Sequence, residues 1–181
     1  MFKIYYTIFT LFIIKLMKEK NIYTPLQMTA LVVLRVLIGW HILYEGFSKV
    51  LIPNWSSFGF LQESKWILAG FARWVLAHPN ALNVVDFLNT WGLIAIGLGL
   101  ILGLFTRLAS IFGALLLFAY YSNNPPFIGL EYSVPTEGNY LVVSKTLIES
   151  VALVALAVFP TGLIFGLDMF IWRYRKSKKI K

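Results

Sequence analysis

The sequence predicts an all-α integral membrane protein: a four-helix bundle preceded by a short extra apolar segment, with an interfacial helix in its first outer loop. Of the 181 residues, 59% are hydrophobic and only 13% are charged, a composition that membrane proteins have and soluble domains of this size do not need. Four apolar segments recur along the chain, and the net charge of +8 is concentrated at its two ends. Basic flanks beside apolar spans mark the cytoplasmic side, so we expect no nucleic-acid partner.

The predicted spans cover about residues 28–51, 81–105, 108–121 and 140–165. The first ends before Pro53, and the third ends before the breaker Asn123-Asn124-Pro125-Pro126. Pro160 would kink the fourth or end its regular part. The Thr106-Arg107 turn between the second and third spans is basic, as both chain ends are, so all three should lie on the cytoplasmic side.

The remaining segments flank these spans. The apolar run between Lys3 and Lys15 is shorter than the about 20 residues that a span needs. No Ala-x-Ala cleavage site follows it, so we do not interpret it as a removed signal peptide. Residues 58–76 are rich in aromatics but too polar to span, which suits an interfacial or re-entrant helix over the outer mouth of the bundle. The predicted division is an N-terminal apolar and basic segment (1–26), a four-span membrane domain (27–170) and a basic cytoplasmic tail (171–181).

A charged stripe lies inside the first span. His41, Glu45 and Lys49 are four residues apart and share one helical face, with Arg35 at its edge, whereas Gly39, Leu43 and Val50 point elsewhere. A charge at mid-membrane costs roughly 2.5–3.5 kcal/mol, so the stripe must face protein or water. Lys145 and Glu149 repeat the spacing in the fourth span at the same expected depth. We therefore expect Glu45 to meet Lys145, and Lys49 to meet Glu149.

Two interpretations of this polar cluster stay open: an ion-pair network that sets helix register, or a pocket that binds a ligand. For the pocket, the candidate catalytic residues are His41, Glu45, Lys145 and Glu149, because a histidine beside carboxylates can transfer protons. The candidate substrate-binding residues are Arg35, Tyr44, Lys49, Asn89, Tyr120, Asn123 and Asn139. The chain has no cysteine, HExxH motif, Walker loop or GxGxxG turn, and no metal site is predicted. Haem ligation by His41 is a weaker alternative. The glycines at 97, 99, 103 and 113 are interpreted as close helix packing.

Four segments together resemble one family: LRVLIGWHILYEGFSKV, VVDFLNTWGLIAIGLGLILGLFTRLAS, YYSNNPPF and EGNYLVVSKTLIESVALVALAVFPTGLIFGLD. The chain resembles the DoxX family, and within it the DoxD-like branch that includes the membrane subunit of thiosulfate:quinone oxidoreductase. The resemblance implies a multi-pass protein of a prokaryotic inner membrane and, for the thiosulfate-oxidising relatives, electron transfer to quinone together with a second subunit. The matching residues are Arg35, His41, Glu45, Lys49, Asn139, Lys145 and Glu149.

The expected function is thus the membrane subunit of a redox system that binds a quinone or a small anion in the outer half of the bundle. The expected partners are the lipid bilayer, a second redox subunit and a second copy of the chain. A non-catalytic membrane anchor of a redox or envelope complex is the alternative. A small-molecule transporter is less favoured, since four spans show no clear inverted repeat.

Overall fold

The four longest helices described are α2 (Pro25–Leu51), α5 (Pro79–Leu102), α6 (Thr106–Asn123) and α7 (Lys145–Val158). The structure is a computed structural model that describes residues 24–133, 139–159 and 161–178. The shorter helices are α3 (Phe58–Gln62), α4 (Ala69–Leu76), α8 (Thr161–Ile164) and α9 (Leu167–Lys178). Strands β1 (Asn139–Tyr140) and β2 (Val143–Ser144) form an antiparallel hairpin with Asn139 opposite Ser144.

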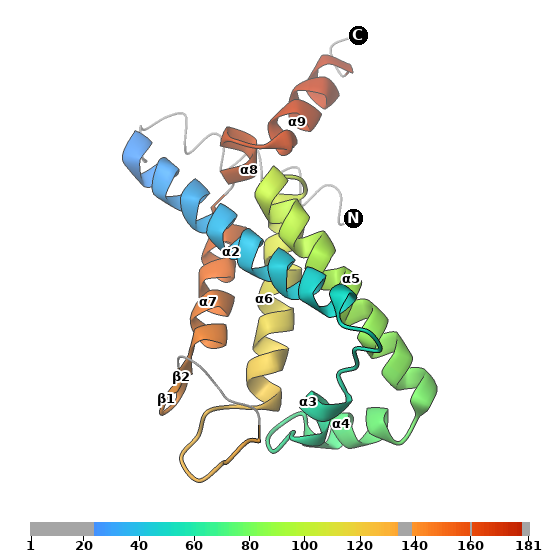
Figure 1. Cartoon of the computed structure of the whole chain (residues 1–181). Coiled ribbons are helices and arrows are strands. Elements are labelled where there is room, and N and C mark those ends of the chain that lie inside the picture. Colours follow the sequence, from blue (N-terminus) through green and yellow to red (C-terminus); the bar gives the residue numbers. More distant parts are fainter. Residues whose placement is uncertain (1–23, 134–138, 160, 179–181) are drawn as a thin grey trace, which may run out of the picture.

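The chain runs back and forth between two ends of the molecule (Figure 1). α8 and α9 lie at one end, here called the α9 end, together with the start of α2 and the turn between α5 and α6. α3, α4 and the β-hairpin lie at the opposite end, here called the α4 end. α2 crosses α6 and α7 obliquely, whereas α6 and α7 run nearly side by side. This crossing decides which charged side chains can meet.

The first three predicted helices are confirmed with small changes in their bounds. Thr24 caps α2 in a reciprocal capping box with Gln27 ahead of Pro25, and Gly103 ends α5 with a left-handed φ of 64°. α2 and α5 are each long and apolar enough to cross a membrane. The segment 58–76, in which a single interfacial or re-entrant helix is expected, forms two short helices, α3 and α4.

The fourth predicted span is wrong as a single helix. Residues 139–144 form the β-hairpin, and α7 begins only at Lys145, where Ser144 caps it by accepting a hydrogen bond from the Leu147 amide. α7 ends at Val158, two residues before Pro160, as proline requires. Its 14 residues span roughly 21 Å at 1.5 Å per residue. Most of the predicted segment 1–26 and part of the tail 171–181 lie outside the described residues.

The core forms where α2 packs on α5 and α6 packs on α7. Ile42, Leu93, Leu100, Leu153 and Leu156 are almost completely buried there. Glycines allow the close approach, because a Cβ at Gly97 would lie 2.7 Å from the Leu43 backbone and one at Gly113 3.0 Å from the Leu153 side chain. The predicted packing role is therefore confirmed at both positions.

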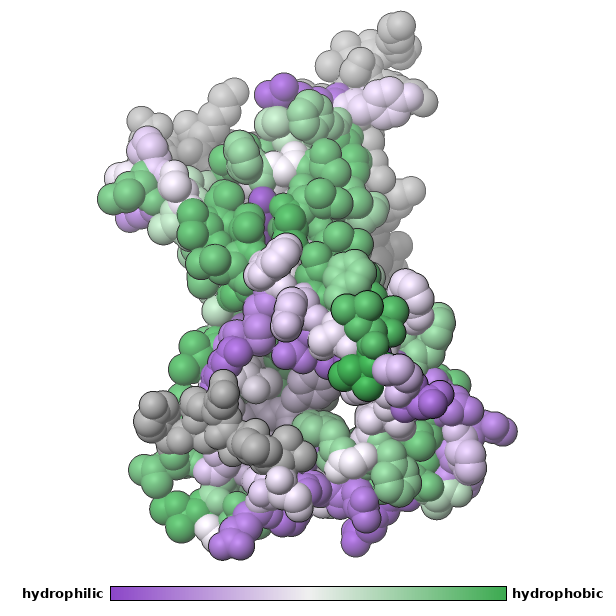
Figure 2. All heavy atoms as spheres, viewed as in Figure 1, coloured by the Kyte–Doolittle hydropathy of each residue, from purple (hydrophilic) through white to green (hydrophobic). Residues whose placement is uncertain are grey.

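The outward faces of these helices are apolar as well. Large hydrophobic side chains on α2, α5, α6 and α7 are about half exposed or more, among them Leu37, Leu88, Leu115 and Val151. In Figure 2 the half toward the α9 end is almost uniformly hydrophobic, and hydrophilic side chains form a band across the middle and the α4 end. Apolar surface on this scale suits contact with lipid, whereas water would disfavour it.

Candidate functional site

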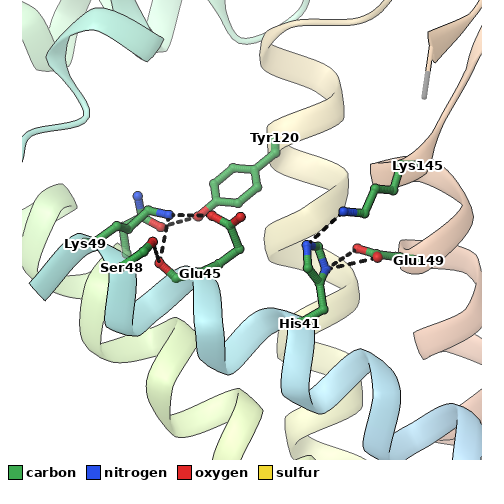
Figure 3. Close-up of polar contacts among 8 residues, drawn as sticks. His41, Glu45, Ser48, Lys49, Tyr120, Lys145 and Glu149 are labelled. Atoms are coloured by element: carbon green, nitrogen blue, oxygen red, sulfur yellow. Dashed lines mark hydrogen bonds and ion pairs between the residues drawn. The ribbon is translucent and has the colours of Figure 1, made fainter. Parts of the chain in front are cut away.

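The centre of the polar cluster is His41, which projects from α2 toward the first turn of α7 (Figure 3). Its Nδ1 lies 3.0 Å from Oε1 and 3.1 Å from Oε2 of Glu149. Its Nε2 lies 3.0 Å from Nζ of Lys145. One imidazole therefore links the two charged side chains of α7, which the sequence places on one helical face.

The chemistry of the two partners assigns the proton on the ring. A carboxylate only accepts hydrogen bonds and an ammonium only donates them. Nδ1 of His41 therefore donates to Glu149, while Nε2 accepts from Lys145. A carboxylate that fixes the tautomer and orientation of a histidine in this way is a recurrent feature of proton-transfer sites.

A second group lies further along α2. Lys49 Nζ contacts Glu45 Oε2 at 3.2 Å within the same helix. The same ammonium lies 5.3 Å from the centre of the Trp55 ring, a distance at which a cation is attracted to the face of an indole. Only 13% of the Lys49 side chain is exposed, against 48% for Glu45.

These contacts correct the pairing expected from the sequence. Glu45 pairs with Lys49 instead of Lys145, and Glu149 pairs with His41 instead of Lys49. The physical reason is the oblique crossing of α2 over α7 (Figure 1). Two stripes that cross touch at one point, so only His41 reaches α7, and Glu45 and Lys49 diverge from it.

Tyr120 of α6 joins the second group, as predicted together with Asn89. Its hydroxyl donates a hydrogen bond to Oδ1 of Asn89 on α5. Its ring lies in the space between the two charged groups, with Glu45 beside the hydroxyl (Figure 3). Phe60 of α3 contacts the Tyr120 ring edge to face at 5.7 Å. The loop before α5 thus closes the cluster toward the α4 end.

Four predicted binding residues lie outside this cluster or cannot be placed in it. Tyr44 is 63% exposed on the outward face of α2. Asn123 is buried and donates to the Phe60 carbonyl and the Asn124 side chain, so it fixes a loop. Asn139 pairs through its backbone with Ser144 in the hairpin, and its side chain lies outside the described part of the chain.

Arg35 is the fourth, and it belongs to a separate buried cluster at the α9 end. It donates from Nη1 to the Thr161 hydroxyl at 3.3 Å and from Nη2 to the Phe165 carbonyl at 2.7 Å. Six residues separate Arg35 from His41, which places them roughly 120° apart around the helix. Nearby, Asp168 caps the start of α6 by accepting from the Phe105 and Thr106 amides. This cluster joins the α5–α6 turn to the C-terminal helices.

Trp55 and Phe60 were missed by the sequence reasoning. Each lies in the connection after α2, where no periodic pattern shows which way a side chain points. A hydrogen bond fixes this connection, because Asp86 of α5 accepts from the Ser57 amide at 2.8 Å and from its hydroxyl. The only local signal was an aromatic-rich segment directly after a charged helix face.

The cluster is both charge-balanced and accessible. Lys49 and Lys145 offset Glu45 and Glu149, and His41 in the assigned tautomer is neutral. Of the His41 side chain, 31% is exposed, and of Glu149, 17%. Figure 2 shows a hollow below the hydrophilic band on this face of the molecule. The His41 and Glu149 side chains are therefore partly open to solvent in the folded bundle.

One comparison with known proteins gives a match. The DoxX family model matches residues 30–122, just over half of the chain. No curated protein and no solved structure matches. The matched range contains His41, Glu45, Lys49, Asn89 and Tyr120, whereas Lys145 and Glu149 follow it. Together with two helices able to cross a bilayer, this match shows that the chain is a membrane protein and belongs to the DoxX family.

Proposed function

We propose that this protein is the membrane subunit of a quinone-linked redox system of the DoxD-like branch, and that its polar cluster binds a quinone headgroup. The protein would cross a prokaryotic inner membrane four times, through α2, α5, α6 and α7, with both termini cytoplasmic. The observation that carries the proposal is the partly exposed His41 ring, held between an ammonium and a carboxylate in an otherwise apolar bundle. Ionisable groups in such surroundings are costly, which makes them functional candidates.

The residues present fit a quinone headgroup better than a small anion. A headgroup is uncharged, has oxygen acceptors on opposite sides of an apolar ring, and needs donors set in an apolar site. The Lys145 ammonium has three N–H donors, of which His41 takes one, and the Tyr120 ring supplies an apolar wall beside it (Figure 3). A small anion would be attracted by Lys49 and Lys145 but repelled by Glu45 and Glu149, so the cluster offers it no net positive charge.

The chain's own residues would bind the headgroup and move a proton. The quinone, when bound, supplies the electron-accepting chemistry, with electrons from a second redox subunit. Lys145 would donate a hydrogen bond to the headgroup and thereby leave Nε2 of His41 free. His41 could then take a proton from water at Nε2, with Glu149 stabilising the imidazolium through Nδ1, and pass that proton to a headgroup oxygen, because quinone reduction consumes protons. Glu45, the most exposed carboxylate of the group, would exchange protons with water.

A non-catalytic anchor is the second candidate, and one observation favours it. Each of the six charged or titratable side chains of the cluster already has a partner within the protein. A network that only sets helix register needs no more than that. In this case the complex that the protein organises, together with any second copy, would depend on the outward surface instead.

A charge exchange within α7, Lys145→Glu with Glu149→Lys, separates the two candidates. It keeps one positive and one negative group beside the His41 ring, so an anchor should keep its stability and its partners. A carboxylate at the first position of α7 also suits the helix dipole. The exchange places an acceptor where the headgroup needs a donor and moves the ring proton from Nδ1 to Nε2. A quinone site should therefore lose its ligand.

The measurement is native mass spectrometry of the full chain in lipid nanodiscs with a short-tailed ubiquinone analogue as the probe. Tyr44→Phe is the matched control, because it changes an exposed α2 side chain one residue from Glu45. Loss of quinone binding in the exchanged protein, with thermal stability unchanged and the control still binding, would support the pocket. Equal quinone binding by wild type and exchanged protein, or none by either, would refute it and leave the anchor.

A further inference from the structure

The outward face of α4 forms an apolar stripe that the bundle does not cover. Ile67, Phe71 and Trp74 follow one another at spacings of four and three residues and are 66%, 52% and 54% exposed. Phe71 and Trp74 share one side of α4, and Ile67 lies in the turn directly before this helix. The Phe71 and Trp74 rings stack at 6.1 Å with 24° between their planes, so the stripe presents a broad, flat apolar surface.

Packing on the opposite side of α4 fixes the orientation of this stripe. Ala72 and Val75, on the other side of α4, are completely buried and pack with Leu82 and Val85 of α5. The connection before α4 is bound to the rest of the molecule as well, because the Lys65 amide donates to the Asn123 carbonyl at the end of α6. α4 therefore cannot rotate its aromatic side chains inward without losing this packing.

We propose that α4 lies in the interfacial layer of the bilayer at the α4 end, with Ile67, Phe71 and Trp74 inserted between lipid headgroups and the upper acyl chains. The neighbouring α5 exposes Val84, Phe87, Leu88 and Trp91 by 53–62%. α4 lies across the end of the bundle instead of along it (Figure 1), the position of a helix at a membrane surface.

The polar groups of α4 match the same layer. Exposed Arg73 stands beside the stripe, where its guanidinium can reach a lipid phosphate. Tryptophan is enriched at this depth because its ring is apolar and its N–H can still find an acceptor. His78 adds a further aromatic ring, 5.1 Å from that of Trp74. The partner is thus the lipid interface, and a second copy of the chain is the competing occupant.

Depth-dependent fluorescence quenching tests this directly. The chain has six tryptophans, so one variant keeps only Trp74 and a matched variant keeps only Trp66, with the others replaced by phenylalanine. Trp66 packs within the same end of the molecule against Phe127 at 5.0 Å and Tyr121 at 6.1 Å. Both are reconstituted in phosphatidylcholine vesicles whose acyl chains are brominated either near the glycerol or near the methyl end.

The proposal expects Trp74 to lose emission most with bromine near the glycerol, less with bromine near the methyl end, and little with aqueous iodide. Trp66 should be affected far less by bromine at either depth. Strong quenching of Trp74 by iodide without quenching by brominated lipid would place α4 in water and overturn the proposal. Protection of Trp74 from every quencher would overturn it in favour of a protein partner. Should the single-tryptophan variants misfold, the difference between wild type and Trp74→Phe gives the same readout.

Discussion

Gly97 of α5 packs closely against Leu43 of α2, and this helix contact can be tested by adding one methyl group. A Cβ built at Gly97 lies 2.7 Å from the Cα, Cβ and N atoms of Leu43. Non-bonded carbon atoms settle at about 3.5–4.0 Å. The Cβ of an alanine at position 97 would therefore lie about 0.8 Å too close to Leu43. Because the atoms that it meets are mainly backbone, no side-chain rotation relieves the clash.

The two helices must separate, and the free energy of unfolding falls accordingly. Overpacking a well-packed interface costs typically about 1–3 kcal/mol. Alanine also favours a helix over glycine by up to about 1 kcal/mol, which would hide part of the loss. Gly92→Ala in the same helix removes this complication, because a Cβ at Gly92 meets nothing within 4 Å. The difference between the two variants is then the packing penalty alone.

The assay is unfolding in a fixed detergent mixture, followed by circular dichroism, for wild type, Gly97→Ala and Gly92→Ala. We expect Gly92→Ala to be as stable as wild type or slightly more stable, and Gly97→Ala to be less stable than Gly92→Ala by about 1–3 kcal/mol. Equal stability of the two variants would refute the reasoning, because it would mean that α2 and α5 do not approach as closely as described.

Three further predictions concern polar contacts in other parts of the molecule. Arg35→Met should lower the unfolding free energy by about 1.5–3 kcal/mol, since it removes two hydrogen bonds from a buried charge, and Arg35→Lys should fall between Met and wild type in the same assay. Tyr120→Phe should cost about 1 kcal/mol, and a double-mutant cycle with Asn89→Ala should show that the two losses are coupled. Burial first, and then the charge of Glu63, raise the pKa of Tyr132. The contribution of Tyr132 to stability is therefore complete below about pH 10 and is lost as the pH rises through the raised folded-state pKa. Limited proteolysis of the 124–133 loop should become faster in that higher pH range for wild type but not for Tyr132→Phe.

Most helix boundaries could be predicted because local chemistry sets them. Apolar runs gave the positions of α2, α5 and α6, and proline or asparagine marked where helices end. The segment 140–144 could not be read in this way. Tyr-Leu-Val-Val-Ser is as apolar as a span, but its β-branched residues suit a strand, and Leu141 has a φ of 59° in the turn of the hairpin. Hydropathy measures polarity and carries no information on such backbone geometry.

The members of the candidate site were easier to predict than their contacts. Helical periodicity placed His41, Glu45 and Lys49 on one face and Lys145 with Glu149 on another. Equal depth then suggested two parallel ladders of ion pairs. Which side chains meet depends on the angle between α2 and α7, and the charged residues do not determine that angle.

The packing of α2 on α5 determines it instead. Gly39, Leu43 and Gly46 form the face of α2 that packs against α5, and His41 lies roughly 200° around the helix from Leu43. The two faces of α2 thus have separate tasks. Apolar contacts through the glycine face hold the helix at its oblique angle, and of the charged or titratable side chains on the opposite face only His41 contacts the described residues of α7. A register-setting network would be expected to join the helices at several points, whereas here a single imidazole does so and Glu45 remains half exposed. The cluster is therefore not needed to hold α2 in place, and this favours the proposed binding site over an anchor.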